Sequence, residues 1–242
     1  MDSGSVLVIF ITGIISIALS YALDHLWAAA LPLRVIYLTV RFPGVVLHEC
    51  AHIIGCVCTG ARIRNIVLFS KDGGSVTYTR SKLPYIGDVI ISTAPLFVLP
   101  LALSLLTWIF GTYLGCVFPA YPASLASSEV FMELILAVFG TFSDNLLTGF
   151  NGWFLLYLYL TISLVLSAAP SMQDMKNAAA GSLLLVLGGF LVVRSGIPGA
   201  VSLIDELVHL MGYGFTLGVV YGLVALAASL PLLVVYVYSN HS

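Results

Sequence analysis

Apolar residues dominate the chain in six long runs, and short segments between these runs hold most of the polar residues. The runs cover residues 5–23, 32–58, 84–111, 149–169, 179–195 and 214–238. A membrane-spanning helix needs about 20 mostly apolar residues. The pattern therefore predicts an all-α polytopic membrane protein with about six transmembrane helices. No internal repeat or low-complexity tract divides the chain, so we expect residues 1–242 to form a single membrane-embedded domain.

A shorter amphipathic segment covers residues 129–147. Apolar residues recur there at helical spacing from Phe131 to Phe139, and acidic residues lie off that face. Such a pattern is typical of a helix that lies at the membrane surface. We expect an interfacial helix on the outer side, with a seventh transmembrane span as the alternative.

Residues 61–80 have a different character. Two β-prone runs flank Asp72-Gly73-Gly74, which predicts a β-hairpin. The segment from Arg62 to Lys82 also holds five of the nine basic residues of the chain. Because basic residues concentrate in cytoplasmic loops, we expect this hairpin on the cytoplasmic side.

The composition excludes several classes of protein. Hydrophobic residues make up 60% of the chain and charged residues only 8%, whereas an ordinary soluble domain has about 25% charged residues. A soluble enzyme, a disordered chain and a nucleic-acid binder with a basic face are therefore excluded. Since charge inside a bilayer is costly, the few ionisable residues within the apolar runs indicate function.

One such cluster lies in the run 32–58, which reads His48-Glu49-Cys50-Ala51-His52. Residues four apart lie on the same helical face, so both imidazoles can bind one Zn²⁺. Glu49 lies about 100° around the helix, from where it reaches a metal-bound water instead of the metal. This H-E-x-x-H pattern predicts zinc ligands at His48 and His52, with Glu49 as the catalytic base.

A third ligand must come from another part of the chain, and we look for it in residues 149–177. Asp174 follows the fourth apolar run, which we expect to end on the cytoplasmic side, at the depth of the histidines. Asp174 is therefore the predicted third metal ligand. Asp88, which begins a helix on the same side, is the reserve candidate, although an acid at a helix start is also stabilised by the helix dipole.

Two further groups compete for a metal. Asp205, Glu206 and His209 form a cluster that we interpret as a capped, solvated interfacial turn on the outer side, away from His48. Cys56 lies four residues beyond His52 on the same helical face. Its thiolate is a weaker candidate ligand.

With these residues in place, the chain resembles the site-2 protease family of intramembrane zinc metalloproteases. The resemblance covers roughly residues 44–175. It rests on the H-E-C-A-H helix, Thr59-Gly60-Ala61 at its end, Gly73-Gly74 in the hairpin, Ala94-Pro95 in the next run, and Asp174. The family usually shows N-x-x-P-x-x-P-x-D-G around its aspartate. Here the asparagine, and the glycine after Asp174, are missing, which is typical of a divergent branch.

The resemblance implies an intramembrane zinc metalloendopeptidase with one Zn²⁺ per chain, bound by His48, His52 and Asp174, and with Glu49 activating a zinc-bound water. Its substrates would be membrane proteins, cleaved in or near a transmembrane segment. We expect a multi-pass protein of the cell membrane with the active site toward the cytoplasm. The hairpin either holds an unwound substrate strand by adding it to a sheet edge or simply connects two helices.

Two other functions remain open at this point. A metal transporter or channel would need ionisable residues along a path through several spans, whereas here they cluster at one depth. A catalytically inactive scaffold that retains the metal-binding motif is the second alternative.

Overall fold

The computed structural model is predominantly helical and describes residues 3–31, 33–70, 73–79, 81–82, 85–122, 124–125 and 127–241. These residues form α1 (Ser3–Ala30), α2 (Arg34–Thr59), α3 (Ile86–Tyr113), α4 (Ser128–Phe142), α5 (Gly152–Leu166), α6 (Met172–Ser195) and α7 (Pro198–His241). A short π-helix, η1 (Ser143–Thr148), continues α4. The strands are β1 (Ile63–Val67) and β2 (Ser75–Tyr78). The predicted all-α fold with a small hairpin is confirmed.

Within the described part of the chain, six helical segments are long and apolar enough to cross a membrane: α1, α2, α3, α4 with η1, α6 and α7. The number of candidate spans matches the prediction, but the segments that form them differ. The expected span 149–169 forms the shorter α5, with 15 residues. The segment 128–148, expected to be an interfacial helix, is long and apolar enough to span. The chain is thus compatible with a multi-pass membrane protein.

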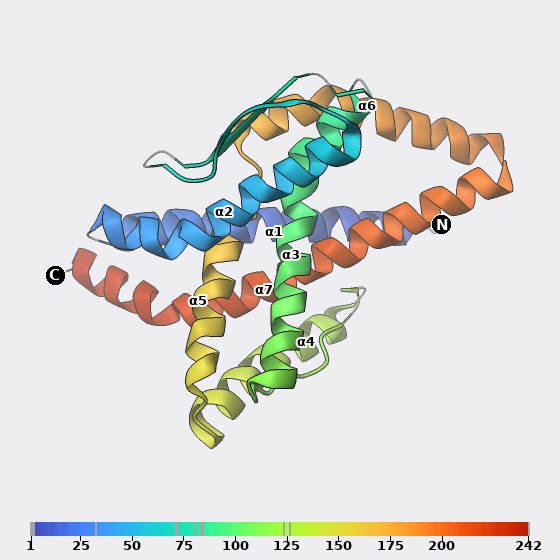
Figure 1. The fold of residues 1–242 in the computed structure, drawn as a ribbon. Coiled ribbons are helices and arrows are strands. Elements are labelled where there is room, and N and C mark those ends of the chain that lie inside the picture. Colours follow the sequence, from blue (N-terminus) through green and yellow to red (C-terminus); the bar gives the residue numbers. More distant parts are fainter. Residues whose placement is uncertain are drawn as a thin grey trace.

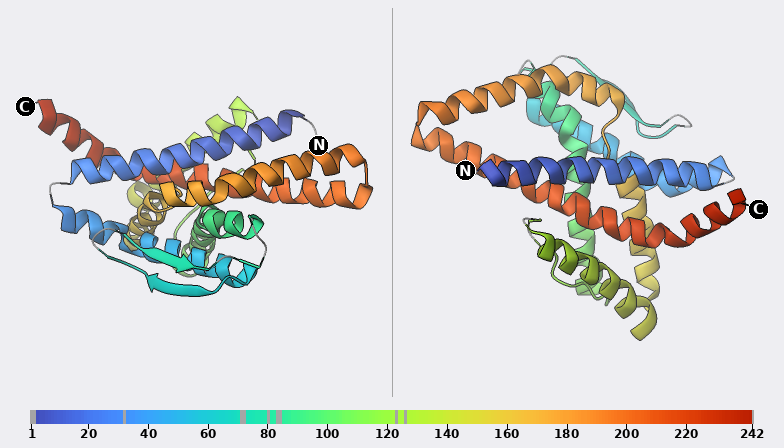
Figure 2. Two further views of the ribbon diagram at one scale, coloured as in Figure 1. Left: turned by 90° about the horizontal axis from the view of Figure 1, so that it is seen from above. Right: turned by 180° about the vertical axis from the view of Figure 1, so that it is seen from behind.

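The helices cross one another steeply and do not form a parallel bundle. Figures 1 and 2 show α3 and α5 running across the direction of α1 and α7, which lie side by side. α2 packs against both α3 and α5. A core of buried residues from α1, α2, α3, α5 and α7 fills the crossing, and it includes Leu23, Ala51, Leu99 and Tyr221. This crossing brings the middle of α2 close to the end of α5 and the start of α6.

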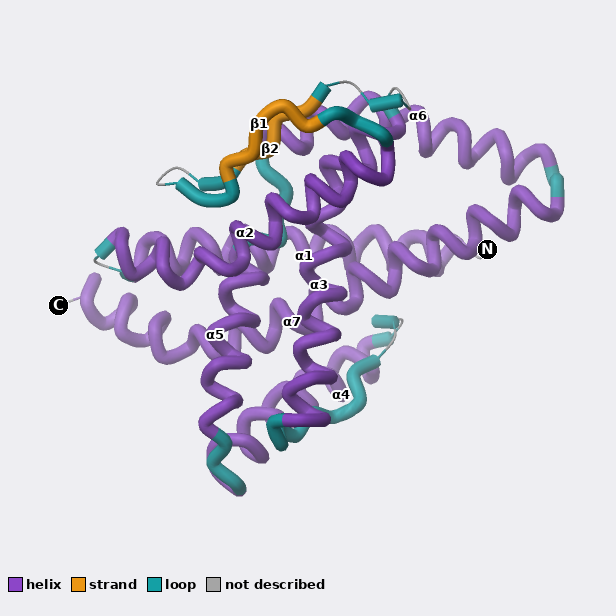
Figure 3. The backbone as a smooth tube through the Cα atoms, viewed as in Figure 1, coloured by secondary structure: helices purple, strands orange, loops and turns teal. Residues whose placement is uncertain are grey.

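The predicted hairpin lies along α2, as the smooth tube in Figure 3 shows. β1 and β2 pair antiparallel, with Val67 opposite Ser75. Lys71, Asp72 and Arg80, which belong to the expected hairpin, lie outside the described residues. α2 ends at Thr59 because Gly60 adopts the left-handed conformation (φ 68°) that glycine favours at a helix end.

Two helices near the C-terminus begin earlier than expected. α6 starts at Met172 rather than at residue 179, because Ser171 and Asp174 form a capping box. α7 starts with Pro198 in its first turn and runs to His241. The interfacial turn expected around Asp205 is therefore wrong, since this segment is helical in the structure.

Candidate metal centre

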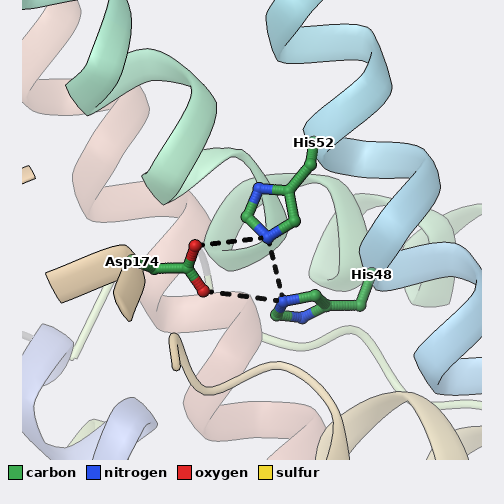
Figure 4. A group of neighbouring side chains, drawn as sticks. All are labelled: His48, His52 and Asp174. Carbon is green, nitrogen blue, oxygen red and sulfur yellow. Dashed lines mark hydrogen bonds and ion pairs between the residues drawn. The ribbon is translucent and has the colours of Figure 1, made fainter. Parts of the chain in front are cut away.

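Two imidazole rings project from α2 and lie next to each other (Figure 4). Nε2 of His48 lies 3.1 Å from Nε2 of His52. Nδ1 of His48 lies 2.6 Å from the carbonyl oxygen of Ser167, and Nδ1 of His52 lies 2.8 Å from that of Ile91. A carbonyl only accepts hydrogen bonds, so each Nδ1 donates. In the neutral rings, both Nε2 atoms then present lone pairs toward the same point.

Asp174 faces the two rings from the first turn of α6. Its Oδ1 lies 3.5 Å from Nε2 of His52, and its Oδ2 lies 3.9 Å from Nε2 of His48. Oδ2 also accepts hydrogen bonds from the backbone N–H and the hydroxyl of Ser171, at 2.9 and 2.6 Å. The capping box that begins α6 thus also orients the carboxylate toward the histidines.

The geometry of these three residues fits a metal ion. One nitrogen or oxygen atom from each of His48, His52 and Asp174 lies within 4.8 Å of the others. Two lone pairs 3.1 Å apart repel each other unless a cation or a proton lies between them. Ligand nitrogens around a tetrahedral Zn²⁺ are about 3.3 Å apart, given Zn–N bonds of about 2.0–2.1 Å. The structure therefore brings the three predicted ligands together in an arrangement that could hold a metal.

The two carbonyl groups that orient the rings are both at irregular points of helices. Ser167 is the C-cap residue directly after Leu166, the last residue of α5, where carbonyls lack partners within the helix. Ile91 lies four residues before Pro95, which has no N–H to donate back to the Ile91 carbonyl. Both oxygens are therefore available to accept a bond from histidine.

Glu49 is buried next to these ligands, with 5% of its surface exposed. Together with His48 it lines a cavity of about 280 Å³, which we call the site cavity. Its Oε2 is buried and has no hydrogen-bond partner among the described residues. Gly74 of the hairpin lies directly against it, because a Cβ at this position would be 2.3 Å from Cγ of Glu49. The hairpin thus covers the predicted base, and a side chain at position 74 would displace it.

α1 holds the segment between α5 and α6, which supplies both the Ser167 carbonyl and the start of α6. The Ser20 hydroxyl donates to the carbonyl of Val165 at 2.6 Å and accepts from the N–H of Ala169 at 2.9 Å. The Tyr21 hydroxyl donates to the carbonyl of Pro170. Sequence reasoning missed both residues, because a lone serine and tyrosine in an apolar helix carry no recognisable motif.

The competing candidates do not join this group in the described part of the chain. Asp88 lines a separate cavity with Tyr78, Gln173 and Asn177. Burial raises the pKa of the Tyr78 phenol on β2. Cys56 is buried but contributes no ligand atom to the group, and neither does the cluster around Asp205.

No protein-family model, curated protein or solved structure matches the chain.

Proposed function

We propose that the protein is an intramembrane zinc metalloprotease of the site-2 type, which hydrolyses peptide bonds in or near transmembrane segments of other membrane proteins. The observation that carries the proposal is the convergence of His48, His52 and Asp174 beside the buried carboxylate of Glu49. Three protein ligands leave one tetrahedral position open, which is the arrangement of catalytic zinc sites.

The residues of the chain have separate roles in this proposal. His48, His52 and Asp174 would hold Zn²⁺, which when bound polarises a carbonyl and lowers the pKa of water. Glu49 accepts the proton of the attacking water and passes it to the leaving nitrogen. In this proposal, water and a peptide segment would reach this carboxylate through the site cavity, which both Glu49 and His48 line.

The membrane setting defines the class of substrate. The histidines lie within α2, one of the six helices long and apolar enough to cross a bilayer. A transmembrane helix hides its carbonyls in its own hydrogen bonds, so a substrate must unwind locally before water attacks it. We propose that the protein lies in the cell membrane with the site toward the cytoplasm, because the segment Arg62–Lys82 next to α2 is rich in basic residues.

The decisive test is the substitution Glu49→Gln, which keeps the shape of the side chain and removes the base. Purified wild type and variant are reconstituted with single-span membrane proteins, and zinc content and cleavage products are measured. We expect equal zinc content and a loss of cleavage of about 10²–10⁴-fold, the usual contribution of a general base. Cleavage at the wild-type rate in Glu49→Gln would exclude the proposed role.

The same preparation separates the two rival functions. Zinc that enters sealed vesicles at a rate dependent on His48 would favour a transporter. Zinc bound to the wild type without cleavage of any tested transmembrane segment would favour an inactive scaffold. Either result would overturn the protease proposal.

A further inference from the structure

One turn of α1 contacts the segments that support the candidate metal centre, although α1 contributes no ligand to it. Ser20, Tyr21 and Asp24 are spaced so that they share one face of the helix, and we call them the polar patch of α1. Tyr21 and Asp24 line the site cavity. Ser20 is buried, with 2% of its surface exposed. A polar group in an apolar helix needs a hydrogen-bond partner, and each of these three finds one in another helix or connection.

Ser20 interrupts the hydrogen-bond pattern at the end of α5. In a continuing helix, the N–H of Ala169 would donate to the carbonyl of Val165, four residues earlier. Here the Ser20 hydroxyl lies between the two groups, donating to that carbonyl at 2.6 Å and accepting from that N–H at 2.9 Å. A side chain inserted in this way breaks the regular pattern of the helix. The chain can therefore turn after Leu166 and lead into α6.

The same turn frees the carbonyl group that orients His48. In a continuing helix, the Ser167 carbonyl would accept from the N–H of Ser171. That N–H instead donates to Oδ2 of Asp174 at 2.9 Å, as part of the capping box of α6. The Ser167 carbonyl thus remains available to Nδ1 of His48, which lies 2.6 Å away. One backbone arrangement therefore orients two of the three predicted ligands, His48 through the carbonyl and Asp174 through the capping box.

Tyr21 and Asp24 connect both sides of the site to this one turn of α1. The Tyr21 hydroxyl donates to the carbonyl of Pro170, the residue before the N-cap of α6. Asp24 accepts from the Tyr37 hydroxyl at 2.7 Å and lies 3.1 Å from Nε of Arg41, and both of these residues belong to α2. Since α2 carries both histidines and the connection leads into α6, the polar patch holds these two parts of the metal centre in a fixed relation.

We propose that the polar patch of α1 is a positioning element of the metal centre. Ser20 and Tyr21 are its positioning residues, and they act on the ligands through the backbone of the α5–α6 connection. The affinity and the coordination geometry of the metal therefore depend on hydrogen bonds from side chains that coordinate nothing. The inference rests on the zinc site of the proposed function but not on peptide cleavage.

Loss of the Ser20 hydroxyl has a defined structural consequence. The N–H of Ala169 can then bond directly to the carbonyl of Val165, which extends α5 and turns the Ser167 carbonyl away from His48. Loss of a group that orients a metal ligand typically lowers metal affinity by about 10–100-fold. Ser20 and Tyr21 act one step further from the metal, so Ser20→Ala and Tyr21→Phe should each raise the zinc Kd about three- to tenfold. The double variant should raise it more than about tenfold.

Metal binding tests this inference without reference to cleavage. The two single variants and the double variant are purified as full chains in phosphatidylcholine nanodiscs, and competition with a chromogenic chelator measures the zinc Kd. Ser229→Ala is the matched control, because Ser229 is equally buried (1% exposed) and accepts a hydrogen bond from Trp27 of α1 at 2.8 Å, but lies on α7. It should keep the wild-type Kd. A wild-type Kd in both Ser20→Ala and Tyr21→Phe, or an equal rise in Ser229→Ala, would overturn the inference.

A spectroscopic measurement separates positioning from a general loss of stability. Co²⁺ in place of Zn²⁺ gives visible absorption bands that respond to the number and geometry of the ligands. At saturating Co²⁺, the bands of Ser20→Ala should differ from those of the wild type, and those of Ser229→Ala should not. Without metal, the two serine variants should lose similar stability in denaturant, since each loses a buried hydrogen bond. An unchanged Co²⁺ spectrum in the double variant would overturn the positioning role.

Tyr21→Phe removes a single hydroxyl and carries both measurements if Ser20→Ala does not fold. Cleavage assays then distinguish this inference from the protease proposal. If the wild type cuts no peptide while Tyr21→Phe lowers the zinc affinity and changes the Co²⁺ spectrum, the protease function fails and the positioning role stands. If the wild type cuts peptides and the variants match its metal binding, the positioning role alone fails. If the wild type binds neither metal, both proposals fail.

Discussion

Asp174 has two structural roles that a single substitution can separate. Its Oδ2 completes the capping box with Ser171, and its two carboxylate oxygens lie 3.5 and 3.9 Å from Nε2 of His52 and His48, respectively. Asp174→Asn keeps an oxygen that accepts the hydrogen bonds of Ser171 and removes the negative charge. The start of α6 should therefore change in stability by less than about 1 kcal/mol, the typical value of a cap. The metal affinity, in contrast, should fall steeply.

The expected size of that fall follows from known metal sites. Loss of a group that merely orients a ligand typically lowers metal affinity 10–100-fold. Loss of the charge on the ligand itself should lower the affinity further, by about 100-fold or more. At zinc concentrations 100 times the wild-type Kd, we expect bound zinc to stabilise the wild type by about 2.7 kcal/mol. The same zinc concentration should stabilise Asp174→Asn by about 0.4 kcal/mol or less.

Competition with a chromogenic chelator measures the affinity, and denaturant unfolding with and without zinc measures the stabilisation. Ser171→Ala is the matched control, because it breaks the cap and leaves the carboxylate in place. It should cost about 1 kcal/mol without zinc and lower the zinc affinity by about tenfold. If Asp174→Asn bound zinc within about threefold of the wild type, the carboxylate would not be a ligand and the three-residue metal site would be refuted.

Two further substitutions test how the rest of the fold supports the site. Gly74→Ala should keep the zinc content but lower cleavage at least about tenfold, since the new Cβ would lie 2.3 Å from Cγ of Glu49. Gly140→Ala is the control, because a Cβ at that position meets no atom within 4 Å. An equal loss of cleavage in both variants would contradict this explanation. Pro95→Ala supplies an N–H that competes for the Ile91 carbonyl, so it should lower zinc affinity by about 10–100-fold while stabilising α3. An unchanged zinc titration of Pro95→Ala would show that this carbonyl does not orient His52.

The sequence predicted the features that depend on local patterns. His48 and His52 share a face because helical geometry alone sets their spacing, whatever packs around them. The end of α2 at Gly60 and the hairpin around Gly73-Gly74 follow from the backbone freedom of glycine in the same local way. We predicted Asp174 as the third ligand because the fourth apolar run should end on the same side of the membrane as the histidines. The structure places Asp174 beside them.

Other features depend on tertiary contacts and could not be predicted in this way. The steep crossing of α3 over α7 depends on how side chains interlock, and the nearly uniform apolar composition of both helices does not encode it. The early start of α6 could have been recognised, because Ser171 and Asp174 have capping-box spacing. Ser20 shows its role only once α1 lies against the α5–α6 connection.

Irregular helix geometry explains how an apolar chain builds a polar site with few charged residues. A regular helix uses its carbonyls internally, so it has none to offer a histidine. Here the end of α5 leaves the carbonyl of Ser167 available, and Pro95 leaves that of Ile91 available. Each of these carbonyls orients one histidine ring through its Nδ1 and leaves Nε2 available for a metal. The site therefore needs no additional buried carboxylate to fix the tautomers of the two rings. The missing backbone hydrogen bond at Pro95 and the end of α5 therefore both support the candidate metal site, and Asp174 is the charged residue that completes it.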